Sequence, residues 1–134
     1  MMKNLVAVIA LLPLAITACS GSLSKEAGCR EIGQYSAEAA TTLDRAKSSI
    51  SIDESRQLFA QRLVEIVEEA ATLKIGDREV VDAVQSWASS TKEVGTALKD
   101  YDLSSASYAE KNVLFTILNE ALIAESRLLR VCDL

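Results

Sequence analysis

The stretch of sequence that decides the fold is DREVVDAVQSWASSTKEVGTAL, residues 77–98. Its apolar side chains recur at alternating steps of three and four residues, which is the period of an α-helix with one buried face. Asp77 stands just before the stripe and can cap the first turn of such a helix. The stripe consists of Val80, Val84, Trp87, Thr91, Val94 and Leu98. We therefore expect a helix that packs against partners along its whole length.

Two segments before this stretch show the same period. The first runs over about residues 24–49, and its seam is Cys29, Ile32, Ser36, Ala39, Leu43, Ala46 and Ile50. The second begins near Ser51, where Ser51 and Glu54 have the spacing of a capping box, and Gly76 is expected to end it. Its apolar face is Phe59, Leu63, Ile66, Ala70 and Leu73. Each segment predicts one amphipathic helix.

A fourth periodic segment follows a second capping-box candidate, Ser107 with Glu110. Its apolar face is the widest of the four and comprises Leu114, Ile117, Leu118, Ala121, Leu122, Leu128, Leu129 and Cys132. No strand-like alternation competes with these helical patterns. We expect an all-α domain over residues 25–134, folded as a four-helix bundle with up-down-up-down topology.

The N-terminus has the pattern of a targeting segment. Lys3 supplies a positive charge, residues 5–15 form an apolar run of signal-peptide length, and Ile16-Thr17-Ala18-Cys19 follows. These four residues resemble the lipobox of bacterial lipoproteins, which has an aliphatic residue, two small residues and a cysteine. The resemblance implies that residues 1–18 are a signal peptide and that cleavage precedes Cys19. Cys19 would then carry a diacylglycerol and an N-acyl chain such as palmitate, with residues 19–24 as a short tether.

The same resemblance implies a lipid-anchored, extracytoplasmic protein of the bacterial cell envelope. Ser20, in place of an aspartate after the lipidated cysteine, implies the outer membrane if the cell is Gram-negative. In a Gram-positive cell the anchor would lie in the outer face of the cytoplasmic membrane. Because the tether spans at most about 17 Å when extended, we expect the start of the first helix to lie near the lipid bilayer and the opposite end of the bundle to point away from it.

The cysteine count fits this interpretation. The chain has three cysteines, and assigning Cys19 to lipid leaves Cys29 and Cys132 as a pair in an oxidising compartment. Antiparallel helices of similar length would bring the start of the first helix beside the end of the fourth, where these two residues lie. We expect a disulfide between them; the alternative is two buried free thiols.

Composition argues against several functional classes. The chain has 14 Lys and Arg against 19 Asp and Glu, for a formal net charge of −5, and it has no histidine. An acidic chain without a basic cluster makes nucleic acid an improbable partner. The lack of histidine excludes His-based triads and histidine-ligated metals. We expect no enzyme activity, no metal site and no cofactor beyond the lipid on Cys19; the acidic run Glu65, Glu68 and Glu69 is expected to be a solvated face.

Two groups of residues are candidate sites. Counting along the antiparallel helices, we expect Ser36, Trp87 and Glu125 to lie at one level, as a buried polar cluster that sets helix register or as the anchor of a ligand pocket. At the end of the bundle opposite the cysteines, the candidates for contact with a partner protein are Ile52, Tyr101, Leu103 and Tyr108. Tyr101 and Leu103 could instead plug the end of the core. A third candidate surface is the flank of the fourth helix with Val113, Ile117, Ala124 and Val131.

These observations predict a non-catalytic, membrane-anchored lipoprotein that acts as a helical protein-binding module, of which an exclusion or inhibitor protein of the envelope is one form. Its partners would be the lipid bilayer, through the acyl anchor, and an envelope or foreign protein. The alternative function is a lipid-binding or small-molecule-binding bundle with its pocket near Glu125. An internal apolar cavity of roughly 300 Å³ or more would favour that alternative.

Overall fold

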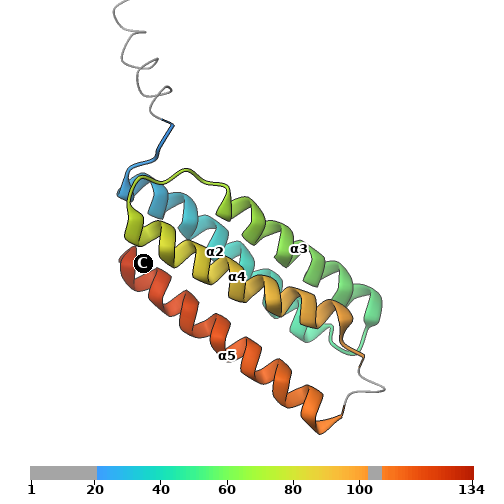
Figure 1. Cartoon of the computed structure of the whole chain (residues 1–134). Helices are drawn as coiled ribbons and strands as arrows, with labels where there is room; N and C mark the ends of the chain where they lie inside the picture. Colours follow the sequence, from blue (N-terminus) through green and yellow to red (C-terminus); the bar gives the residue numbers. More distant parts are fainter. Residues whose placement is uncertain (1–20, 103–106) are drawn as a thin grey trace, which may run out of the picture.

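The computed structural model describes residues 21–102 and 107–134. Cys19 with its lipobox, and Leu103, lie outside the described residues. Four α-helices account for most of the described chain: α2 (Lys25–Ser48), α3 (Asp53–Ala71), α4 (Arg78–Asp100) and α5 (Tyr108–Val131) (Figure 1). No strand occurs in these two ranges, so the prediction of an all-α domain with four helices is confirmed.

Side-chain caps begin three of the helices. Ser24 precedes α2, and its hydroxyl accepts a hydrogen bond from the amide of Ala27 at 3.2 Å. The carboxylate of Asp77 accepts from the amide of Val80 at 3.0 Å at the start of α4, as the sequence predicted. At the start of α5, Ser107 and Glu110 form the predicted capping box. Such caps satisfy amide groups that the first helical turn leaves without a backbone partner.

The boundaries of α3 differ from the prediction at both ends. Its N-cap is Ile52, whose hydrocarbon side chain cannot accept a hydrogen bond, and the Ile52 amide donates to the Ser49 carbonyl in the turn before the helix. Ser51 therefore does not form the expected capping box. At the other end α3 stops at Ala71 with Thr72 as its C-cap, so Gly76 does not end the helix.

Gly76 has a different role, in the connection between α3 and α4. Its amide donates to the carbonyl of Leu23 at 2.9 Å, and the amide of Leu23 donates to the carbonyl of Lys74 at 2.7 Å. These two bonds form an isolated parallel bridge between Leu23 and Ile75. Ile75 is buried, and its side chain approaches the backbone of Gly28 in α2. The N-terminal segment is thereby attached to the α3–α4 connection before α2 begins.

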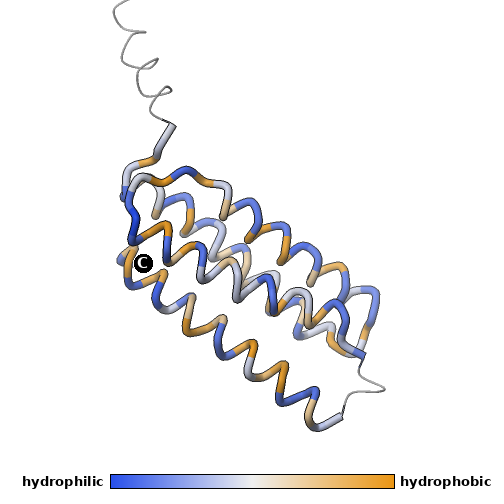
Figure 2. The backbone as a smooth tube through the Cα atoms, in the orientation of Figure 1, coloured by the Kyte–Doolittle hydropathy of each residue, from blue (hydrophilic) through white to orange (hydrophobic). Residues whose placement is uncertain are grey.

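Helix α4 lies at the centre of the packing. It packs along α3 and along α5 and also contacts α2, while α3 packs along α2. All six residues of the predicted α4 stripe are buried: Val80, Val84, Trp87, Thr91, Val94 and Leu98. Hydrophobic residues recur periodically along the helices, as the colouring of Figure 2 shows. The period of the sequence therefore identified the buried face of this helix correctly.

Helix α5 is buried over a narrower face than its sequence suggested. Leu114, Ala121, Ala124 and Leu128 are its buried residues. In contrast, Leu122 is 56% exposed although it belongs to the predicted apolar face. The reason is that α5 packs along α4 but is not packed along α2, and its ribbon diverges from the other helices toward its N-terminal end (Figure 1).

One covalent bond joins α5 to α2 at the opposite end. Cys29 and Cys132 form the predicted disulfide, with their Cα atoms 5.4 Å apart and a sequence separation of 103 residues. Cys29 is buried in the core and Cys132 packs against it. The two helices are therefore held together at the cysteine end and open at the other.

Candidate functional site

The open seam between α2 and α5 is a groove, which we call the α2–α5 groove. At its wide end, away from the disulfide, it encloses about 280 Å³ lined by residues that include Ile50, Tyr101, Leu114 and Phe115, with Lys47 and Lys111 on its two sides. Toward the disulfide it narrows to a cavity of about 30 Å³ between Ala39, Ala40 and Leu43 of α2 and Ala121 and Leu122 of α5. Leu118 lines both parts, so they form one continuous feature.

The structure brings Ser36, Trp87 and Glu125 to the lining of the narrow cavity. Ser36 and Trp87 are buried, and Glu125 is half-buried. No hydrogen bond joins the three side chains, so they share one level of the bundle without forming a bonded cluster. A volume of about 30 Å³ accommodates one or two water molecules, whereas pockets for small molecules enclose roughly 300–1,000 Å³.

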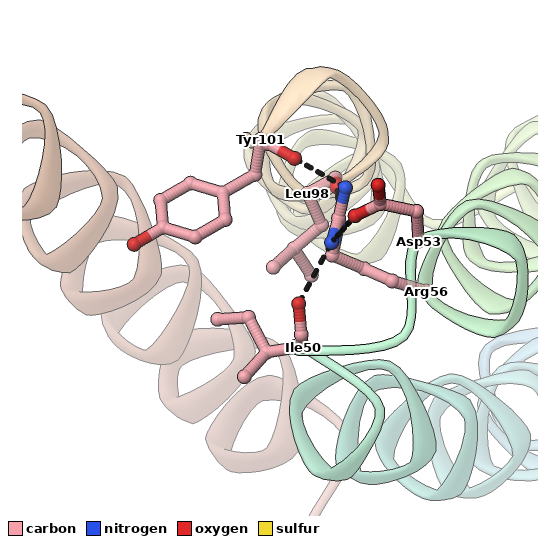
Figure 3. Close-up of polar contacts among 5 residues, drawn as sticks. All are labelled: Ile50, Asp53, Arg56, Leu98 and Tyr101. Atoms are coloured by element: carbon pink, nitrogen blue, oxygen red, sulfur yellow. Dashed lines mark hydrogen bonds and ion pairs between the residues drawn. The ribbon is translucent and has the colours of Figure 1, made fainter. Parts of the chain in front are cut away.

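The end of the molecule opposite the disulfide is organised by a buried arginine that the sequence analysis did not identify. The side chain of Arg56 in α3 is 1% exposed. Its Nε donates to the carbonyl of Leu98 at 2.8 Å, its Nη1 donates to the carbonyl of Ile50 at 2.7 Å, and its Nη2 donates to the carbonyl of Tyr101 (Figure 3). The charge is balanced by Asp53, whose Oδ1 lies 2.8 Å from Nη1.

Arg56 thus connects three segments at one point. The carbonyls of Leu98 and Tyr101 belong to the end of α4, where backbone acceptors have no helical partner and the helix dipole favours a positive charge. The carbonyl of Ile50 belongs to the turn between α2 and α3. The planar guanidinium group can serve all three acceptors because its donors point in fixed, different directions. The ring of Tyr101 also lies near this cation, with its centroid 5.9 Å from Cζ.

A signal for Arg56 is present in the sequence. Arg56 continues the buried stripe of α3 toward its N-terminus at the same alternating steps of four and three residues, and the buried members of this stripe are Ala60, Leu63, Val67 and Ala70. A charged residue at such a position must find partners inside the protein, because burial of an unpaired charge is costly. The partners themselves lie 42 and 45 residues further along the chain, beyond the reach of local pattern.

The residues proposed to contact a partner at this end fall into different environments. Ile52 is 57% exposed and Tyr108 is 82% exposed. Tyr101 is half-buried. It lines the wide end of the α2–α5 groove and also a second surface hollow of about 390 Å³, which lies beside Val113. Tyr101 therefore packs against the end of the hydrophobic core, whereas the side chains of Ile52 and Tyr108 are exposed at the surface.

The predicted flank of α5 is only partly accessible. Val113 is 59% exposed, whereas Ala124 is buried and Ile117 and Val131 are half-buried against the core. A continuous interaction surface over all four residues is therefore not present.

The acidic run on α3 is neutralised by neighbouring cations. Arg62 forms an ion pair with Glu38 at 2.7 Å and lies near Glu65 and Glu69, and Lys92 pairs with Glu68 at 2.9 Å. The hydrogen bond to Glu38 raises the pKa of Arg62, a side chain that is protonated in any case. Within residues 21–102 and 107–134, no group of three or more acidic or cysteine side chains is placed to hold a metal ion.

None of the four described helices has an apolar stretch long enough to cross a membrane. No protein-family model, curated protein or solved structure matches the chain.

Proposed function

We propose that this protein is a non-catalytic lipoprotein of the bacterial cell envelope that holds a helical protein-binding module close to a membrane. The lipobox at residues 16–19 supports the anchor, and the disulfide between Cys29 and Cys132 is in keeping with an oxidising, extracytoplasmic compartment. The envelope location and the acyl groups on Cys19 are part of this proposal.

For the domain we propose the up-down-up-down topology expected from the sequence. Two features support it. Short connections join α2 to α3 and α3 to α4, and short connections in helical bundles usually join antiparallel neighbours. The disulfide also brings the start of α2 to the end of α5.

The observation that carries the binding function is the concentration of exposed apolar side chains on one helix. Among the described residues, eight large hydrophobic side chains are exposed, and five of them belong to α5: Tyr108, Val113, Phe115, Leu122 and Ile123. Full burial of a side chain such as phenylalanine or leucine contributes about 1.5–3 kcal/mol. Of these five, Phe115 and Leu122 line the α2–α5 groove. Exposed apolar side chains beside an apolar groove are typical of a site that another protein covers.

The anchor is tested by labelling cells that produce the full chain with an alkyne analogue of palmitate. We expect the wild-type protein to carry the label and to sediment with membranes. The Cys19→Ser variant should lose the label and remain a full-length precursor. Equal labelling of the two proteins would contradict lipidation of Cys19.

The binding function is tested by placing a photo-crosslinking amino acid at single surface positions of the anchored protein in intact cells. We expect protein adducts from position 108 or 115, which belong to the exposed set on α5. Leu58 in α3 is the matched control, because it is 66% exposed but lies on a different helix. Adducts that form equally from position 58, or no adducts from α5, would contradict the proposal.

A further inference from the structure

An apolar stripe on α5 faces the α2–α5 groove. Phe115, Leu118 and Leu122 follow one another at steps of three and four residues, the spacing by which one helix packs against another. Each of the three lines the groove. Phe115 is 70% exposed and Leu122 is 56% exposed. The stripe thus has the form of a helix-packing surface that no other element in the described part of the chain covers completely.

The charges that continue this stripe are arranged symmetrically about Leu118. Lys111 lies seven residues before Leu118, and Glu125 lies seven residues after it. If two such helices pack antiparallel with their Leu118 residues side by side, Lys111 of each helix lies opposite Glu125 of the other. A parallel pair would place like charges opposite each other, which is unfavourable. The stripe is therefore complementary to a second, antiparallel copy of itself.

We propose that two copies of this chain pair through antiparallel α5 helices, with the stripe of each copy covering the α2–α5 groove of the other. In this arrangement Leu118 lies on the two-fold axis. The interface is then isologous, because the same surface of both copies forms it. Two Lys111–Glu125 ion pairs flank the apolar centre.

The shape of the groove fits this arrangement. Leu122 of one copy lies at the level of Leu114 of the other, at the wide end that encloses about 280 Å³. The bulky Phe115 lies at the level of Ala121, where the groove walls carry small side chains such as Ala39 and Ala40. Large side chains therefore meet either space or small residues across the axis, as in a closely packed interface.

This pairing goes beyond the proposed function and does not depend on lipidation. If both copies are anchored, their disulfide ends lie at opposite ends of the pair, so that the helices run along the membrane with one tether at each end. This differs from the upright arrangement expected for a single anchored copy.

Site-directed crosslinking tests the antiparallel geometry. One copy of the full chain carries Lys111→Cys and a second, differently tagged copy carries Glu125→Cys; the two are produced together and oxidised in membranes. We expect a mixed adduct between the two variants. The two copies of position 111 lie about 21 Å apart along the axis, so adducts between two Lys111→Cys copies should be absent. In the control, Asn112→Cys takes the place of Lys111→Cys opposite Glu125→Cys. Asn112 is exposed but lies about 100° around the helix from Lys111, so we expect this mixed adduct to be weaker.

Adducts between two copies that carry Lys111→Cys would overturn the antiparallel pairing. So would a mixed adduct no more abundant than that from Asn112→Cys.

A charge exchange provides a second, independent measurement. Sedimentation of the detergent-extracted full chain should show a dimer, and Lys111→Glu alone should weaken it about tenfold by placing two pairs of like charges across the axis. The double variant Lys111→Glu with Glu125→Lys should restore the wild-type affinity. Lys111 is exposed and Glu125 is half-buried, so we expect the variants to fold, and circular dichroism is the measurement that checks this.

A monomeric wild-type protein, or a double variant no stronger than the single one, would refute the self-pairing. Mass spectrometry of the photo-adducts distinguishes a foreign protein from a second copy of this chain, to which Phe115 also lies close in the proposed pair. Foreign adducts test the proposed function and sedimentation tests self-pairing, so failure of one proposal is distinguishable from failure of the other.

Discussion

The substitution Arg56→Lys provides the sharpest test of how the distal end of the bundle is held together. Lysine keeps the positive charge, but its ammonium group is a single point on a flexible stem and cannot reach acceptors in three directions. In the wild-type protein, Arg56 donates to the carbonyls of Ile50, Leu98 and Tyr101. We expect lysine to satisfy one of these acceptors and to leave the other two without the guanidinium donors.

The magnitude follows from the number of bonds lost. A hydrogen bond to a charged group contributes roughly 1.5–3 kcal/mol, although buried contributions are not additive. Allowing for partial solvation of the freed carbonyls, Arg56→Lys should lower the free energy of unfolding by about 3 kcal/mol. Arg56→Met, which leaves all three carbonyls without a side-chain donor, should cost about 3–5 kcal/mol, because each buried acceptor left unsatisfied costs roughly 1–3 kcal/mol and these costs are not additive. These are large fractions of the roughly 5–15 kcal/mol that stabilise a typical domain.

The measurement is urea unfolding of the full chain with the disulfide intact, followed by circular dichroism. Two matched controls isolate the buried contacts. Arg62→Lys changes an arginine that forms ion pairs at the surface, and Asp53→Asn removes the exposed partner of Arg56 while leaving its carbonyl contacts. Each control should cost much less than Arg56→Lys, because solvent screens ion pairs that involve an exposed side chain. If Arg56→Lys is no more destabilising than Arg62→Lys, the three-carbonyl contact does not stabilise the fold and our reasoning is wrong.

Two further predictions concern the helix contacts. Gly95→Ala should lower the free energy of unfolding by about 1–3 kcal/mol, although alanine has the better helix propensity, because a Cβ atom at Gly95 would lie 2.6 Å from Cγ2 of Val64. Adding Val64→Ala should recover part of this loss in urea unfolding. A Gly95→Ala protein that is more stable than the wild type would contradict the close contact between α3 and α4. Replacing both Cys29 and Cys132 by serine should lower the free energy of unfolding by about 2–4 kcal/mol. Amide hydrogen exchange should accelerate more in the last turns of α5 than in α4. Equal acceleration in both helices would show that the disulfide does not act locally on α5.

The buried face of α4 was predictable from the sequence because other helices pack around this helix. Its neighbours are α3, α5 and α2, so every apolar residue of its period finds a partner, from Val80 to Leu98. The disulfide was predicted from two expectations: that Cys19 carries lipid, which leaves two cysteines, and that an up-down-up-down topology brings those two together. The Cys29–Cys132 bond itself is present in the structure.

The exposure of α5 was not predictable in the same way. A hydrophobic period shows which face of a helix can be buried, but it does not show whether another helix covers that face. Leu122 belongs to the predicted apolar face and is nevertheless exposed, because α5 packs along α4 and is not packed along α2. Its exposure depends on the crossing geometry of helices that are far apart in the sequence.

The candidate sites differ in the same way: one could be found from the helical period and the other could not. The common level of Ser36, Trp87 and Glu125 could be found by counting helical turns, because these residues lie on regular helices. The contacts of Arg56 could not, since its acceptors are backbone carbonyls at the end of α4 and in a turn. Backbone carbonyls are present at every residue, and the sequence does not show which of them the fold directs toward a given side chain.

The bridge between Leu23 and Ile75 determines how the protein would respond to a pulling force at its N-terminus. Because the Leu23 amide and carbonyl are bonded to Lys74 and Gly76, tension applied before Leu23 passes first to the connection between α3 and α4. The first turn of α2 then does not carry this tension. If the first turn does unfold, the Cys29–Cys132 bond prevents the chain from extending beyond Cys29. The domain should therefore resist mechanical unravelling from this end better than a helix that carries the load along its own axis.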